Sequence, residues 1–198
     1  MALFYDLETD SQHDYQALHD AFDVLRSSRR SWHIEAQGDA ADRKRHAGAT
    51  SLVRRKEVSL VKSSPPFVKT NIEVPAIPCG RQVIYFFPDR LLVFQKDGVG
   101  AVAYSDLEVE RRTERFIEES VLSPDATVVD RTWKYVNKKG GPDRRFKGNM
   151  ELPIALYEDL QFRSRSGLNE LLQFSKAGVA NPLETALRNL AKNVPQTG

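Results

Sequence analysis

Cysteine is almost missing from this chain of 198 residues, which contains a single one, Cys79. No disulfide and no cluster of several thiolates can form within one chain, which fits a reducing compartment. Long apolar runs are missing as well, and the first ten residues, MALFYDLETD, include no Lys or Arg. We therefore expect neither a secretory signal nor a membrane-spanning helix, and we predict a cytoplasmic protein.

Metal-binding motifs are also missing. There is no HExxH pattern and no Cys/His cluster, and all four histidines lie in the first quarter: His13, His19, His33 and His46. The first two are six residues apart, which does not place both on one helix face as a spacing of four would. We expect no structural zinc site. Cys79 has no neighbouring base in the sequence, and we predict a spectator thiol there.

Patterns that indicate catalysis are weak. Gly98-Val99-Gly100 lacks the third glycine and the strand-to-helix context of a nucleotide-binding loop. Asp125, Asp130 and Lys134 could be arranged around a metal as in a nuclease, although their spacing does not require it. We therefore predict no catalytic residues, no metal and no cofactor, and keep a metal-dependent nuclease as a second alternative.

Charge is unevenly distributed, although the net charge is only +2. Residues 1–25 carry six acids and no Lys or Arg, whereas residues 26–62 carry ten Lys or Arg against four acids. Residues 131–147 carry seven against one. Separated charges of this kind favour local electrostatic docking or self-association over attraction to a bulk polyanion.

The densest apolar content lies in residues 82–110, QVIYFFPDRLLVFQKDGVGAVAYSDLEVE. Pro88-Asp89 and Lys96-Asp97-Gly98 predict two tight turns, and strands joined by such short turns must pair antiparallel. We therefore predict a three-stranded meander that forms the centre of the fold.

Helices are predicted at both ends of the chain. In residues 11–28 the apolar side chains Tyr15, Leu18, Phe22 and Leu25 recur at three- and four-residue steps. Residues 166–174 show a similar short pattern, and Pro182 is suited to the first turn of a last helix. Further strands are predicted at 31–37, 51–62, 67–77, 127–136 and 152–162.

This order of elements predicts a mainly β, α+β protein. Strands and helices do not alternate along the sequence as they would in a parallel sheet. We expect a curved antiparallel sheet or open barrel closed by a C-terminal helix. Three regions are predicted: an N-terminal helix with a basic irregular or strand segment (1–62) that packs on the core, a β domain with its closing helix (63–176), and a C-terminal helix and tail (177–198).

Three segments carry a resemblance: YFFPDRLLVF, VGAVAYSDL, and LYEDLQFRSRSG running into a helix. Over residues 67–176 they resemble bacterial pleckstrin-homology-like (PH-like) domains, including GRAM-type variants. TWKYVNKKGGPDRRFKGNMELP resembles segments of uncharacterised bacterial proteins of this kind. The resemblance implies a binding scaffold for proteins or phospholipid head groups, without catalysis. Here the basic insertion precedes the last predicted strand, whereas in lipid-binding PH domains it joins the first two, so no site residue is transferred.

The strongest candidate site is the basic loop, residues 134–147. Its cations are Lys134, Lys138, Lys139, Arg144, Arg145 and Lys147, and the aromatic residues Trp133, Tyr135 and Phe146 are interleaved with them. Arg144 and Arg145 could hold a phosphate, exposed amides near Gly140 could meet an anion, and the aromatic rings could stack on bases. We also expect Asp143 to pair with a neighbouring Arg. The alternative is that the aromatic rings pack inward and the lysines only solvate a turn.

A secondary basic patch combines Arg43, Lys44, Arg45, Arg54, Arg55 and Lys56. It could contact phosphates non-specifically, or it could keep a loop soluble or pair with the acidic N-terminal helix. We therefore predict a non-catalytic binding module that recognises a protein partner or an anionic, phosphate-bearing group through the basic loop. The first alternative is a nucleic-acid-binding domain that uses both basic patches and the aromatic residues.

Overall fold

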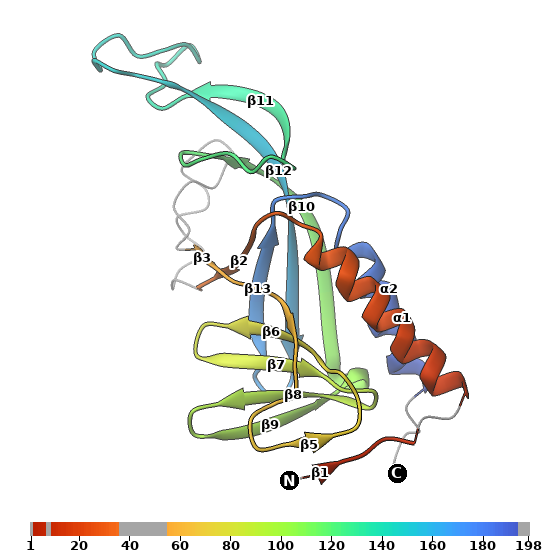
Figure 1. Ribbon diagram of the computed structural model, residues 1–198. Coiled ribbons are helices and arrows are strands. Elements are labelled where there is room, and N and C mark those ends of the chain that lie inside the picture. The colour runs from red at the N-terminus through yellow and green to blue at the C-terminus, as the bar shows by residue number, and fades with distance from the viewer. Residues whose placement is uncertain (1, 7–8, 36–54, 194–198) are drawn as a thin grey trace.

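The computed structural model describes residues 2–6, 9–35 and 55–193 (Figure 1). Two helices lie near the two ends of the chain, α1 (Thr9–Arg26) and α2 (Asn181–Asn193). The predicted stripe of α1 is confirmed, because Tyr15, Leu18, Phe22 and Leu25 are all buried. In the described residues, no helix is long and apolar enough to cross a lipid bilayer.

The predicted meander is confirmed, and its three strands form one side of a five-stranded antiparallel sheet. Its strands are β4 (Val61–Lys62), β6 (Pro75–Cys79), β7 (Gln82–Phe86), β8 (Arg90–Gln95) and β9 (Gly98–Ala103), in that spatial order. The β7–β8 register pairs Tyr85 with Leu92, and the β8–β9 register pairs Leu92 with Ala101. A short 3-10 turn, η2 (Tyr104–Asp106), leads from this sheet into the next.

A larger antiparallel sheet has the order β10-β12-β13-β2-β3, with β11 paired to β12. Its strands are β2 (Ser31–Ile34), β3 (Arg55–Glu57), β10 (Leu107–Ile117), β11 (Thr127–Trp133), β12 (Glu151–Ser164) and β13 (Asn169–Phe174). Two short strands, β1 (Ala2–Leu3) and β5 (Lys69–Thr70), form a separate parallel pair. Strands from the predicted N-terminal region therefore belong to the same sheet as strands near the C-terminus.

The helix predicted for residues 166–174 is wrong, since this segment forms β13. Gly167, at φ +102°, makes the turn out of β12, and the strand then runs back along it with Leu160 opposite Leu172. The spacing of its leucines also fits a helix. In the structure, however, β12 and β2 pair with its two edges and satisfy the hydrogen-bonding groups of its backbone. Tertiary pairing decided the conformation.

One core joins both sheets and both helices. Phe86 of the smaller sheet lies with its ring centroid 5.9 Å from that of Phe162 in the larger sheet and 6.1 Å from that of Phe22 in α1. Leu183, Leu187 and other apolar residues of α2 belong to the same buried cluster. Figure 1 shows α1 and α2 side by side along one flank of the sheets. The fold is thus mainly β with antiparallel sheets and a helix at each end, and the described strands form no closed barrel.

Candidate functional site

The basic loop lies at the end of a projection from the larger sheet. β12 pairs with β10 only as far as Ile154, and its first residues pair with β11 alone, ending at Trp133 opposite Glu151. We call residues 127–153 the arm. Figure 1 shows it reaching well beyond the other strands, with the loop at its far end.

Hydrogen bonds within the loop fix its tip. The Asn137 carboxamide oxygen accepts from the backbone N–H groups of Lys139, at 2.8 Å, and of Gly141, at 3.1 Å. Its nitrogen donates to the Pro142 carbonyl at 3.1 Å, and the Gly140 N–H donates to the Asn137 carbonyl at 3.0 Å. These amides already have acceptors inside the loop. An anion would have to replace these bonds, so the expected contact through them stays a prediction.

Tyr135, where the loop meets the strands, is fixed by two hydrogen bonds and one ring contact. Its backbone N–H donates to the Asn149 carboxamide at 3.0 Å, and its carbonyl accepts from the same side chain at 2.7 Å. Its ring stacks on that of Phe146, with centroids 4.1 Å apart and planes 13° apart. Both rings are still about two-fifths exposed, at 40% and 43%.

Asp143 organises the second half of the loop, as predicted. Its buried carboxylate accepts from Arg145 Nε at 3.0 Å and Nη2 at 2.6 Å, and also from the Arg145 backbone N–H. These hydrogen bonds lower the pKa of Asp143. Nε and Nη2 of Arg145 are engaged in this way, so a joint grip of Arg144 and Arg145 on one phosphate would compete with Asp143 and stays a prediction.

Four cations remain at the tip, all exposed: Lys138, Lys139, Arg144 and Lys147. Within the described part of the chain none of these four has an ion-pair partner, whereas Lys134 lies 3.5 Å from Glu119. Exposed apolar side chains lie among them, namely Tyr135, Val136, Phe146 and Met150. Trp133 is half-buried at the end of β11 and presents less of its ring.

Most of the secondary basic patch, namely Arg43, Lys44, Arg45 and Arg54, lies outside the described residues. Lys56 is exposed on β3. Arg55, however, lies with its guanidinium carbon 4.3 Å from the Trp32 ring centroid and 4.4 Å from that of Phe116. It also bonds both carboxylate oxygens of Glu118 at 2.6 Å. The Arg55 charge is neutralised inside the fold.

Glu118 is the acid of this buried pair. Burial alone would raise the pKa of its carboxyl, but hydrogen bonds from Arg55, Ser120 and Tyr157 outweigh burial and lower the pKa to about 2. Burial and the Glu118 charge in turn raise the pKa of Tyr157. The network stands where the chain leaves β10 on its way to the arm.

The three residues considered for a nuclease have separate partners. Asp125 accepts from the backbone N–H of Arg29 at 2.7 Å and from Ser175 at 2.7 Å. Asp130 pairs with Arg115 at 2.8 Å, on the arm. They do not form a cluster of metal-ligand type.

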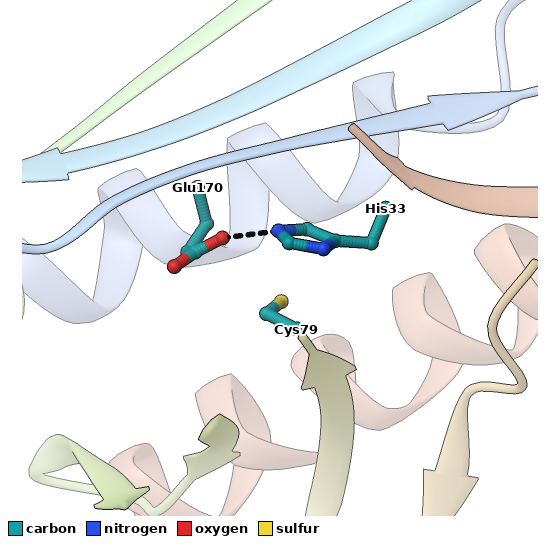
Figure 2. A group of neighbouring side chains, drawn as sticks. All are labelled: His33, Cys79 and Glu170. Carbon is teal, nitrogen blue, oxygen red and sulfur yellow. Dashed lines mark hydrogen bonds and ion pairs between the residues drawn. The ribbon is translucent and has the colours of Figure 1, made fainter. Parts of the chain in front are cut away.

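Such a cluster does exist elsewhere in the described residues, and the sequence did not reveal it. His33 of β2, Cys79 of β6 and Glu170 of β13 converge, with one ligand atom from each all within 4.8 Å of one another (Figure 2). Glu170 hydrogen bonds to His33 Nε2 and to the Gln82 amide. Burial raises the pKa of the Cys79 thiol, which keeps it protonated and argues against a nucleophile. The three residues are far apart in the sequence, so no local motif could have found them.

Comparison of the chain with protein-family models, with curated proteins and with solved structures finds no match. The tip of the arm is a surface feature built from exposed cations. The His33, Cys79 and Glu170 cluster is an internal feature built from ligand atoms.

Proposed function

We propose that this chain is a non-catalytic binding module that recognises an anionic, phosphate-bearing group through the tip of its arm. The observation that carries the proposal is the set of four exposed cations without ion-pair partners in the described residues, Lys138, Lys139, Arg144 and Lys147. An antiparallel meander and a C-terminal helix support a PH-like scaffold beneath them. The predicted protein partner stays a prediction.

The physical case is one of charge and preorganisation. Arg144 offers a planar fork for two parallel hydrogen bonds to a phosphate, and the lysines add compact charges around it. Because Asn137 and Asp143 already hold the backbone, less conformational freedom is lost when a ligand binds. Exposed Val136 and Met150 add apolar contact next to the charges.

Nucleic acid is the second candidate, because of one observation. The stacked pair Tyr135 and Phe146 lies among the cations with part of each ring exposed. Aromatic rings between cations bind single strands by stacking on bases while the cations follow the backbone. Such binding weakens steeply as salt rises.

The experiment compares two quadruple alanine variants of the full chain. The tip variant replaces Lys138, Lys139, Arg144 and Lys147, and the control replaces four exposed cations outside the arm, Arg81, Lys96, Arg165 and Lys176. The ligands are vesicles with and without phosphoinositide, and single-stranded and duplex oligonucleotides, each at low and near-physiological salt. We expect the tip variant to lose at least about tenfold in affinity and the control to change little.

Equal loss in both variants would indicate only net-charge attraction and would contradict the proposal. Binding to oligonucleotides but not to vesicles would select the second candidate. Absence of binding to any of these ligands at low salt would remove both. Unchanged melting temperatures in both variants are required, because all eight side chains are exposed.

A further inference from the structure

The convergence of His33, Cys79 and Glu170 joins the two sheets. His33 and Glu170 lie on neighbouring strands of the larger sheet, and Cys79 ends a strand of the smaller one. Figure 2 shows the three side chains pointing toward one another, with the Cys79 sulfur on the lower side of the His33 ring in this view. One ligand atom from each residue lies within 4.8 Å of the others.

The donor set has the chemistry of a zinc ligand sphere. A metal ion displaces the thiol proton when it binds cysteine. A thiolate sulfur, an imidazole nitrogen and a carboxylate oxygen suit Zn²⁺ and Co²⁺, whereas Mg²⁺ and Ca²⁺ take oxygen ligands. Zinc lies about 2.3 Å from sulfur and about 2 Å from nitrogen or oxygen, which places its ligand atoms about 3–4 Å from one another. Small side-chain rotations would bring the three atoms to that spacing, since all lie within 4.8 Å of one another.

His33 has an unused position. The residue is 6% exposed, and its Nδ1 is buried without a hydrogen-bond partner in the described structure. Buried polar atoms are nearly always satisfied. A cation on Nδ1 would leave the Nε2 hydrogen bond to Glu170 intact, and Glu170 would then orient the His33 ring, as carboxylates commonly do for histidines that bind zinc, and would not be a ligand itself. A cation on Nε2 would replace that hydrogen bond, and His33 Nε2 and the Glu170 carboxylate would each bind the ion. In either case Cys79 Sγ is a ligand.

Neighbouring residues hold the cluster in position. Gln82 donates to Glu170, and Gln95 donates to the Gln82 oxygen at 2.8 Å, so the carboxylate is oriented by a chain of amides. Gly80, at φ +61°, brings its backbone against the ring, and a Cβ there would lie 3.2 Å from His33 Cε1. Gln82 and Gly80 are positioning residues for the cluster.

We propose that His33, Cys79 and Glu170 bind a divalent cation of the zinc class. The ion would join β6 of the smaller sheet to β2 and β13 of the larger one. This site is inside the fold and independent of the arm, so neither proposal depends on the other.

Cobalt titration of the chelator-treated full chain provides the test. A bound Co²⁺ with a thiolate ligand gives a near-ultraviolet charge-transfer band, and Cys79 is the only residue of the chain that can supply the thiolate. We expect this band to rise and saturate at one ion per chain, and Zn²⁺ to displace it. The wild-type spectrum therefore identifies the ligand without any substitution. Absence of the band at saturating Co²⁺ would overturn the proposal.

Variants then test the remaining ligands. Cys79→Ser is expected to abolish the band, and His33→Asn to weaken Co²⁺ binding by more than about 100-fold, beyond the loss typical of outer-shell changes. The matched control is His13→Asn, whose exposed side chain lies on α1 and should leave binding unchanged. Zn²⁺ should also raise the melting temperature of wild-type protein and of the control, but not of Cys79→Ser. Equal Co²⁺ affinity in His33→Asn and wild type would contradict the assignment.

Discussion

Arg55 and Glu118 form an ion pair whose acid is almost fully buried, with 1% of its side chain exposed. Taking two charges out of water is unfavourable, and the loss is recovered only with good geometry and further hydrogen bonds. Here Tyr157 and Ser120 supply those bonds, while Trp32 and Phe116 contact the cation with their ring faces. Removing either partner therefore leaves an uncompensated charge inside the sheet.

The pH dependence of stability should reveal this pair. The pKa of Glu118 is lowered from 4.5 to about 2, so the folded state binds fewer protons than the unfolded state between these values. Its contribution is complete above pH 4.5 and is lost as pH falls through about 2. We expect Glu118→Gln to destabilise the protein near neutral pH by about 3 kcal/mol, and this deficit to shrink in acid. Denaturant unfolding of both proteins across this range measures it.

The neighbouring acid offers the control. Glu119 is half-exposed, and its partner Lys134 lies 3.5 Å away. Glu119→Gln should change stability by less than about 0.5 kcal/mol at any pH. If the deficit of Glu118→Gln were constant with pH, the lowered pKa would be wrong.

The sequence indicated which residues are charged, but it indicated their ion-pair partners only where the two residues are close along the chain. Asp143 and Arg145 are two residues apart, and their pairing was predicted because the chain brings them together locally. Arg55 and Glu118 are 63 residues apart, so Arg55 was grouped with an exposed patch. The His33, Cys79 and Glu170 cluster was missed for the same reason.

At the scale of elements, the arm is a strand pair with a loop that supplies its own hydrogen bonds. Asn137 connects both sides of the tip through its side chain. We expect Asn137→Ala to loosen the loop while leaving the body intact, with a change of less than about 0.5 kcal/mol in global stability. Hydrogen exchange should show faster exchange at the amides of Lys139 and Gly141.

Asn189→Ala, an exposed substitution on α2, is the matched control and should alter no amide in the arm. Protection at Lys139 and Gly141 that survives Asn137→Ala would show that the backbone of the loop, and not this side chain, fixes the tip. The result also bears on ligand binding, because a loosened loop should bind phosphate-bearing groups more weakly.

Local pattern was enough for some elements and not for others. The meander of β7, β8 and β9 was predicted because its turns are short and force antiparallel pairing. β13 was predicted as a helix because Leu168, Leu171 and Leu172 fit that period as well. Only pairing with β12 and β2, which are distant in sequence, distinguishes the two conformations.

At the scale of the whole molecule, one core joins the two sheets. Phe162 of the larger sheet is fully buried against Phe86 of the smaller one. We expect Phe162→Ala to reduce the free energy of unfolding by about 3–5 kcal/mol. Unfolding followed by tryptophan fluorescence and by circular dichroism should give one coincident transition.

Val99→Ala, at a side chain that is 51% exposed, is the control and should change stability by less than about 0.5 kcal/mol. Two separate transitions in wild-type protein, of which Phe162→Ala shifts only one, would show that the sheets unfold independently.

β12 belongs to two structures at once, because its first residues form half of the arm and its last residues lie at the centre of the larger sheet. β12 is one continuous strand of 14 residues, and its neighbours β10 and β13 both pair with its second half. A partner that binds the tip would therefore also fix the orientation of the rest of the molecule. Fluorescent labels on the body should then report a fixed orientation relative to whatever surface the tip contacts.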